Sequence, residues 1–161
     1  MTYHIRVRPT ALIIQNGSIL LIEYTDEHGV HYNLPGGGAE PGETLAEGAA
    51  REVLEETCAE AEVGPIAFVY EMAPHRQSGD HPNSPHNLSI IFECTLKEGS
   101  VPRLPDQPDP KQSAVKWIPL SELDSIVLYP NISGHIRRFV NRRATMELIE
   151  DHELDSYAQT K

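Results

Sequence analysis

The chain has 161 residues, about the length of one domain, and it carries 13 Lys and Arg against 24 Asp and Glu, a net charge of −11. This acidic balance repels polyanions and disfavours nucleic acid as the main partner, whereas a metal that bridges carboxylate and phosphate still allows an anionic small substrate. The sequence has no apolar run near the ~20 residues of a membrane span, no signal-like start, and two distant cysteines, Cys58 and Cys94, so we expect a cytoplasmic protein with free thiols and no membrane partner.

The first third of the chain predicts three strands. β-Branched and apolar residues fill 4–14 and 18–24, and the Asn-Gly pair between them is a strong turn signal, so a hairpin is expected. Residues 30–34 form a short predicted strand that runs into the Pro-Gly-Gly-Gly segment 35–38. Glycines in that segment would let the backbone approach a ligand closely.

A helix is expected to follow Thr44, because Glu47, three residues later, completes a capping box. At 100° per residue its small and aliphatic side chains fall on one arc and its acidic ones roughly opposite, so one face should pack while the other faces a site. Gly48 lies on the acidic side, where it either leaves room for a bound group or simply permits close packing. The expected packing arc comprises Ala46, Ala49, Ala50, Val53 and Leu54.

The rest of the chain predicts more strands and a second helix. The polar loop 72–86, with three prolines and three histidines, is long enough that we expect it to border a pocket. Residues 1–144 are assigned to one domain, and residues 145–161 to an acidic C-terminal tail that is helical at most in part. The further expected elements are strands at 61–71, 87–96 and 113–118, a short turn or helix at 119–123, and a helix at 132–143.

The segment REVLEE within the first helix concentrates acidic residues. Glu52, Glu55 and Glu56 stand at i, i+3 and i+4, so three carboxylates share one helix face within about one turn. Like charges at these spacings repel, at a few tenths of a kcal/mol per pair on an exposed helix. A hard divalent cation such as Mg²⁺ or Mn²⁺ is the natural compensation, and the histidines lack the tight spacing of a zinc site.

The spacing of these residues with the preceding loop fits the pattern G-x5-E-x7-R-E-U-x-E-E, where U is bulky and aliphatic. This pattern resembles the Nudix box of the Nudix hydrolases. The chain departs from the box at its end, where Cys58 and Ala59 replace a glycine and an aliphatic residue, a change at the helix exit and not on the acidic face. The positions that carry the match are Gly37, Glu43, Arg51, Glu52, Val53, Glu55 and Glu56.

The resemblance implies an α+β fold, an α/β/α sandwich with a mixed β-sheet between helices, and hydrolysis of a nucleoside diphosphate linked to another moiety. Carried over by position, Glu52, Glu55 and Glu56 would ligate Mg²⁺ or Mn²⁺, with help from the backbone carbonyl of Gly36. The same likeness places Arg51 in the catalytic set, as the partner of Glu43 in an ion pair that fixes the loop against the helix.

The general base and the substrate-binding residues stay open. Glu55 or Glu52 is the expected base by family position, and Glu93 on the strand 87–96 is an alternative. For the substrate, Gly37 and Gly38 offer close backbone approach, Tyr24 offers a ring for stacking, and Glu93 offers a carboxylate.

Three functions are compatible with the box. The leading hypothesis is an enzyme that cleaves a compound such as ADP-ribose or a nucleotide sugar. The alternatives are a nucleoside triphosphate pyrophosphohydrolase, which would share the whole metal site, and a Nudix-like module that binds a nucleotide without cleaving it. All charged box positions are present, which favours an enzyme. Relatives are often dimers, so a homodimer is an expected assembly.

Overall fold

A computed structural model describes residues 4–76, 78, 84–142 and 148–156. Its strands and helices follow one another in the order that the sequence predicted, and the structure adds two short strands, Leu128–Tyr129 and Leu148–Glu150, and a 3₁₀ turn at Asp151–Glu153. The elements are β1 (Arg6–Gln15), β2 (Ser18–Asp26), β3 (Gly29–Asn33), α1 (Leu45–Thr57), β4 (Ala61–Met72), β5 (Asn87–Leu96), β6 (Gln112–Pro119), η1 (Leu120–Ser125), β7 (Leu128–Tyr129), α2 (Ser133–Arg142), β8 (Leu148–Glu150) and η2 (Asp151–Glu153).

The predicted hairpin is present, but its two strands stay paired only at its tip. Asn16 and Gly17 both adopt positive φ, 52° and 75°, as a tight two-residue turn requires. The β1–β2 register covers the two residue pairs next to the turn, and β1 pairs in parallel with β5 from Arg6 to Ile13. Where β2 leaves, the loop takes its place: Ala39 donates its backbone N–H to Val7 O. The glycine-rich loop is therefore fixed along β1.

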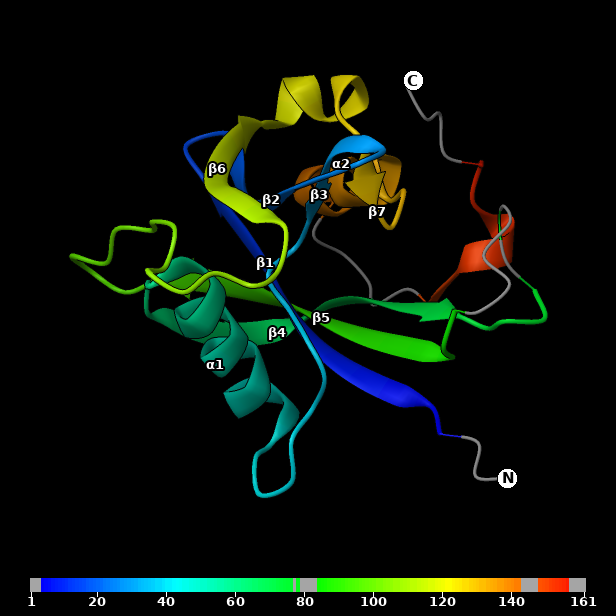
Figure 1. Ribbon diagram of the computed structural model, residues 1–161, viewed down its shortest axis with the longest axis horizontal. Helices are drawn as coiled ribbons and strands as arrows, with labels where there is room; N and C mark the ends of the chain where they lie inside the picture. Colours follow the sequence, from blue (N-terminus) through cyan, green and yellow to red (C-terminus); the bar gives the residue numbers. More distant parts are fainter. Residues whose placement is uncertain (1–3, 77, 79–83, 143–147, 157–161) are drawn as a thin grey trace.

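The strands form one mixed sheet with helices on both sides, as expected (Figure 1). The path runs β7-β3-β2-β1-β5-β4-β8, and β6 pairs with β2. Alternation along β1 divides two cores: Leu12 packs in the cluster that contains Ile136 of α2, whereas Ala11 and Ile13 pack in the cluster that contains Val53 of α1. The fold is therefore an α+β sandwich, and α1 is held against one face of the sheet.

Helix α1 begins where the sequence predicted, but the side of the helix that packs on the sheet differs from the predicted packing arc. Thr44 accepts from Glu47 N at 3.1 Å and the Glu47 carboxylate accepts from Thr44 N at 2.7 Å, which completes the capping box. Leu54 was expected on the packing arc, and that prediction is wrong, since it is 50 % exposed. For Gly48 the packing alternative holds: a Cβ there would lie 2.8 Å from Glu43 Oε1 and from Pro9 Cγ.

Helix α1 ends at a non-glycine residue in the left-handed conformation, which glycine adopts most readily. Cys58 adopts the left-handed conformation, with φ 58° and ψ 11°, and donates its backbone N–H to Leu54 O. A residue with a Cβ pays roughly 1–2 kcal/mol to occupy this region. Cys58 in place of glycine therefore strains the backbone at the end of α1, and the helix still ends in the left-handed conformation.

We predict that Cys58→Gly raises the free energy of unfolding by about 0.5–1 kcal/mol, because the relief of strain exceeds the extra freedom that glycine gives the unfolded chain. Urea unfolding monitored by circular dichroism measures the change. Cys58→Ala is the matched control, since it removes the thiol but keeps the Cβ. Equal stability of the glycine and alanine variants would contradict this account of the helix end.

The C-terminal segment differs from the expected tail between residues 148 and 153. β8 pairs in parallel with β4, with Ile149 opposite Tyr70, and Ile149 is 2 % exposed. The following turn buries Asp151, whose carboxylate accepts from the Tyr70 hydroxyl at 2.7 Å and from Ser78 N at 2.6 Å. This stretch is acidic and polar in sequence, yet it contributes to the sheet and to the core. The predicted helix at 132–143 is α2, with residue 143 outside the described residues.

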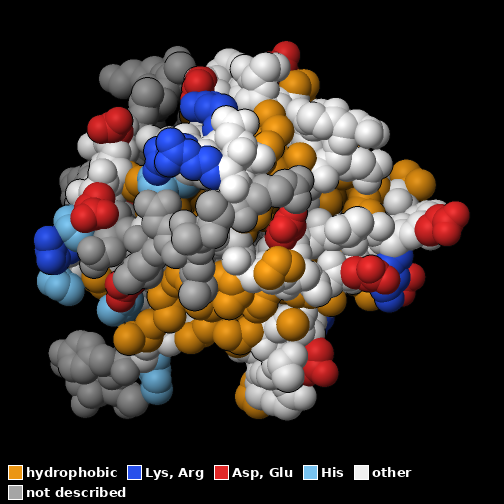
Figure 2. All heavy atoms as spheres, turned by 180° about the vertical axis from the view of Figure 1, so that it is seen from behind, with side chains coloured by type: hydrophobic (Ala, Val, Ile, Leu, Met, Phe, Trp, Pro, Cys, Tyr) orange, Lys and Arg blue, Asp and Glu red, His pale blue; other side chains and the backbone are white. Residues whose placement is uncertain are grey.

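The surface seen from behind carries charge of both signs around its edge. Figure 2 shows acidic side chains scattered over this face, while hydrophobic side chains form a band across its lower half. The acidic excess is thus not gathered into one patch on this side. No described helix is both long enough and apolar enough to cross a membrane.

Candidate active site

Glu56 is the most enclosed carboxylate of α1. It is 4 % exposed, and its two oxygens have separate donors: Gly36 N at 2.8 Å from Oε1 and the Tyr24 hydroxyl at 3.1 Å from Oε2. Burial, together with the charge of Glu52 and against the opposing hydrogen bond from Gly36, raises the pKa of Glu56 to about 8. A buried carboxylate with a charged neighbour favours a cation beside it.

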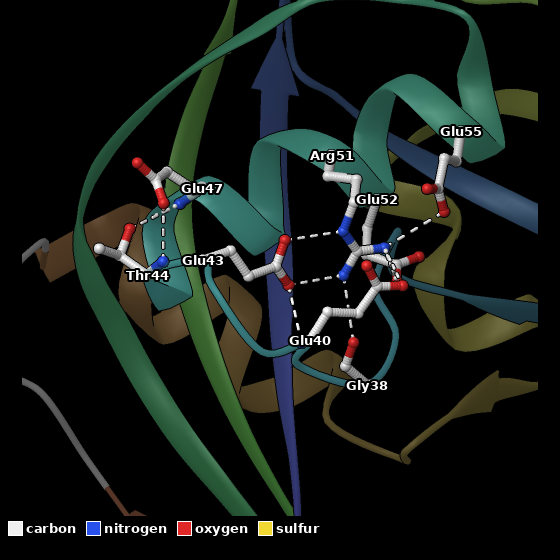
Figure 3. A network of polar contacts seen from close by, with 8 residues as sticks. All are labelled: Gly38, Glu40, Glu43, Thr44, Glu47, Arg51, Glu52 and Glu55. Carbon is white, nitrogen blue, oxygen red and sulfur yellow. Dashed lines mark hydrogen bonds and ion pairs between the residues drawn. The ribbon is translucent and has the colours of Figure 1, made fainter.

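Arg51 donates hydrogen bonds to three other carboxylates of the loop and the helix (Figure 3). Its guanidinium binds Glu43 through two parallel hydrogen bonds, both 2.8 Å, and it donates to Glu52 at 2.8 Å and to Glu55 at 3.2 Å. A further hydrogen bond of 3.1 Å reaches Gly38 O. The bidentate pair with Glu43 ties the loop to the helix, as the resemblance implied, and the same cation partly neutralises the acidic face.

Glu52 is held between the helix and the loop. It is 9 % exposed, and burial raises its pKa while the hydrogen bond from Arg51 lowers it. Gly37 stands directly against its carboxylate, so closely that any Cβ at this position would overlap the carboxylate oxygens. Glu55 differs from both buried glutamates, because its side chain is 56 % exposed. The box glycine is therefore explained by the approach of Glu52.

The pair of Glu43 and Arg51 predicts a dependence of stability on pH. The hydrogen bonds from Arg51 and from Glu40 N hold the pKa of Glu43 at about 2, below its usual value of 4.5. A carboxylate with a depressed pKa in the folded state contributes stability that is complete above the unfolded pKa and is lost as pH falls through the folded one. The stability advantage of wild type over Glu43→Gln should therefore shrink between about pH 4.5 and 2.

Urea unfolding of both proteins at constant ionic strength, from about pH 6 down to about pH 2, measures this difference. Glu98→Gln, at an exposed position in the loop after β5, provides the control for removal of one negative charge. A constant difference between wild type and Glu43→Gln over the whole range would contradict the ion pair.

Arg8 is a site residue that the sequence reasoning missed. It comes from β1, lies beside the charges of Glu52 and Glu56, and places Nη2 3.4 Å from Gly36 O. Burial and the neighbouring Arg6 lower its pKa, and the two glutamates oppose that shift. The available signal was the presence of two arginines, two residues apart, in a strand that otherwise alternates toward a core. Arg8 thus provides positive charge next to the acidic face.

Two of the predicted substrate-binding side chains have other contacts. Tyr24 of β2 donates to Glu56 and stacks on His31 with ring centroids 5.4 Å apart, so it supports a carboxylate from the side of the sheet. Glu93 lies in β5 opposite Leu12 and does not line the cavity of about 300 Å³ that Arg8 borders. Its role as a base stays a prediction.

The acidic residues fit a hard divalent cation by chemistry, since carboxylate oxygens are the ligands that Mg²⁺ prefers. Among residues 4–76, 78, 84–142 and 148–156, however, no three His, Cys, Asp or Glu side chains are arranged to share one ion. Glu52 and Glu55 turn toward Arg51, whereas Glu56 turns toward Gly36. Metal binding would therefore require the first two carboxylates to turn away from the guanidinium.

A cavity of about 300 Å³ opens on the face of the sheet that also carries α2. Arg8 lines it together with residues of β4, β5 and the 72–86 loop, so the prediction that this loop borders a pocket is confirmed for its described part. Arg8 therefore faces the cavity and also lies near the carboxylates of α1. The lining comprises Arg8, Thr10, Asn33, Leu34, Tyr70, Met72, Ser84, Asn87, Ser89, Ile91, Tyr129, Pro130 and Asp151.

Comparison with protein families assigns the chain to a family. The model of the NUDIX domain matches residues 5–142, which is most of the chain. The chain belongs to the NUDIX family. A comparison with curated proteins finds no match. As a Nudix domain, it has the hydrolase fold that the loop, the helix and the mixed sheet indicated.

Solved structures agree with this assignment at the level of the fold. A NUDIX hydrolase from Nitrosomonas europaea is 22 % identical, with a TM-score of 0.66 over 92 % of this chain and 81 % of that one. An ADP-ribose pyrophosphatase from Streptococcus suis 89-1591 is 20 % identical, with a TM-score of 0.63 over 90 % and 99 %. A UDP-X diphosphatase is 19 % identical, with a TM-score of 0.70 over 92 % and 68 %. Identities this low show a shared Nudix fold alone.

Proposed function

We propose that this Nudix protein is a metal-dependent pyrophosphohydrolase that cleaves a nucleoside diphosphate linked to another moiety, such as ADP-ribose or a nucleotide sugar. The observation that carries the proposal is the complete acidic face of α1, two of whose carboxylates are buried beside Arg8. The names of two structural neighbours, an ADP-ribose pyrophosphatase and a UDP-X diphosphatase, support this class of substrate.

The proposed metal ligands are Glu52, Glu55 and Glu56, with the carbonyl of Gly36, and the proposed ion is Mg²⁺ or Mn²⁺. Such an ion, when bound, stabilises charge on phosphate oxygens and lowers the pKa of the attacking water. Arg8 supplies a fixed positive charge on the cavity side of these carboxylates, where it would hold a phosphate oxygen of the substrate. Gly37 and Gly38 keep the loop close enough for backbone contact with the substrate.

The general base is proposed to be Glu55 or Glu52, with Glu93 as the alternative. Exposure favours Glu55, because its carboxylate has the access to water that the buried Glu52 lacks. Separate Glu52→Gln, Glu55→Gln and Glu93→Gln variants test the three candidates by their turnover numbers at saturating metal, because Glu52 and Glu55 are also proposed metal ligands. Full metal-dependent turnover in both α1 variants would exclude them as the base and leave Glu93.

Product identification tests the function itself. The purified protein is incubated with Mg²⁺ or Mn²⁺ and with ADP-ribose, nucleotide sugars, dinucleoside polyphosphates and nucleoside triphosphates, and products are separated by chromatography. Nucleoside monophosphate released from a linked diphosphate supports the proposal. Pyrophosphate released from triphosphates alone would assign a triphosphate pyrophosphohydrolase, and no turnover across the panel would assign a binding module.

A further inference from the structure

The carboxylate of Glu56 is oriented by hydrogen bonds to both of its oxygens. Gly36 N donates to Oε1 at 2.8 Å, and the Tyr24 hydroxyl donates to Oε2 at 3.1 Å. An ionised carboxylate offers about four acceptor positions, two on each oxygen, so one position on each oxygen is left for a cation. The fold therefore sets the direction of these remaining positions. Glu52 and Glu55 differ from Glu56, because both accept hydrogen bonds from a guanidinium and have to turn before they can bind a metal.

The main chain of Glu56 is held as well. Helix α1 ends at Thr57, so the carbonyl of Glu56 is among the last four carbonyls of the helix, which have no partner within it. Gln112 of β6 donates its Nε2 to this carbonyl at 2.9 Å. Gln112 is 6 % exposed, and its Oε1 accepts from Asp109 N at 3.3 Å, so both ends of this buried amide are paired. Glu56 is thus fixed at its carboxylate and at its backbone by residues outside α1.

The two side chains that hold Glu56 are neighbours in the sheet. Tyr24 lies opposite Gln112 in the β2–β6 ladder and opposite His31 in the β2–β3 ladder. The β2–β6 register shifts directly before Tyr24, so β6 has one extra residue there, Ser113, and Gln112 takes the position opposite Tyr24. The ring of His31 stacks on the Tyr24 ring at 5.4 Å with an interplanar angle of 12°. This stacking and the bulge direct Tyr24 and Gln112 to the same residue of α1.

We propose that Tyr24, assisted by Gln112, is a positioning residue for the metal site and holds Glu56 in the orientation that a metal ligand needs. The inference rests on the proposed function, since it concerns the same metal site. Both residues lie outside the segment 37–59 that holds the box, so the box alone does not orient this ligand. Groups that orient metal ligands contribute about 10-fold to 100-fold to metal affinity, although they do not touch the ion.

The test is Mg²⁺ binding without substrate, measured by isothermal titration calorimetry at about pH 9, where Glu56, with its pKa of about 8, is ionised. Tyr24→Phe removes only the hydroxyl and is expected to raise the Kd for Mg²⁺ by about 10-fold or more. Gln112→Met, which keeps the length of the side chain but cannot donate to Glu56 O, should also raise this Kd.

Tyr32→Phe is the matched control. The Tyr32 hydroxyl donates at 2.7 Å to Glu23, a buried carboxylate next to Tyr24 in sequence and therefore on the opposite face of β2. The control removes the same kind of hydrogen bond from a carboxylate that is not a proposed ligand. It should leave the Kd for Mg²⁺ unchanged, even where it lowers the urea concentration at which the protein unfolds.

Steady-state kinetics separate positioning from a general loss of structure. With a diphosphate that wild type cleaves, Tyr24→Phe should raise the Mg²⁺ concentration for half-maximal rate by about 10-fold, and kcat at saturating Mg²⁺ should stay within about twofold of wild type. An unchanged Kd for Mg²⁺ in Tyr24→Phe would overturn the inference, as would an equal rise in Tyr32→Phe.

The proposed reaction can fail independently of this inference. Mg²⁺ binding that depends on Tyr24, without hydrolysis of any diphosphate, would uphold the positioning role and overturn only the reaction. Hydrolysis by a Tyr24→Phe variant whose Kd for Mg²⁺ equals that of wild type would uphold the reaction and overturn the positioning role. Absence of Mg²⁺ binding to wild type would overturn both the positioning role and the proposed ligand set.

Discussion

Glu56→Gln is expected to lower the metal-dependent turnover of the Nudix substrate by about a hundredfold or more. Loss of residues that merely orient metal ligands costs 10–100-fold, so removal of a ligand charge should cost at least the upper value. Glutamine keeps the size of the side chain and one oxygen for Gly36 N, which donates to Glu56 at 2.8 Å. Initial rates measured over a series of Mg²⁺ concentrations give the change.

The same variant separates a metal role from a structural one. With metal chelated and at a pH above the Glu56 pKa of about 8, Glu56→Gln removes a buried charge that Glu52 repels, so its free energy of unfolding should equal or exceed that of wild type. Added Mg²⁺ should raise the melting temperature of wild type and leave that of the variant unchanged. Glu47→Gln is the control, because glutamine also completes the capping box. Wild-type turnover by Glu56→Gln would exclude Glu56 as a required ligand.

The predictable part of the site was local in sequence. Glu43 and Arg51 stand eight residues apart, across the N-cap and about two turns of α1, and the capping box of Thr44 and Glu47 fixes where that helix begins. Spacing within one helix is set by its geometry and needs no knowledge of the rest of the fold. The box therefore predicted which charges meet, and the turn of the first hairpin was predictable for the same reason.

The unpredictable part depends on pairing between distant strands. Arg8 and Asn87 enter the cavity wall because β1 and β5 run in parallel, and no local pattern sets that register. Leu54 was assigned to the packing arc from periodicity. The side of α1 that is buried carries Val53 and Thr57, however, and Leu54 lies outside it. The strand β8 has three residues, too few for alternation to show, and it is specified by β4.

Arg51→Met is expected to lower the free energy of unfolding by about 3 kcal/mol, because it leaves a group of carboxylates without their shared cation. The Arg51 side chain is only 20 % exposed, and its partners Glu43 and Glu52 are 14 % and 12 % exposed. Arg103→Met is the control: its ion pair with Asp106 is largely exposed, at 60 % and 93 %, and its loss should cost less than 1 kcal/mol. Urea unfolding at low ionic strength measures both variants.

Two further measurements identify why Arg51 stabilises the loop. Arg51→Lys keeps the charge but cannot make the paired hydrogen bonds to Glu43, so it should recover about half of the lost stability. At about 1 M salt, where charges are screened beyond ~3 Å, the deficit of Arg51→Met should shrink if repulsion among the carboxylates causes it. If the lysine variant is as unstable as the methionine variant and salt recovers nothing, the hydrogen-bond geometry alone holds the loop, and neutralisation of the acidic face contributes nothing to stability.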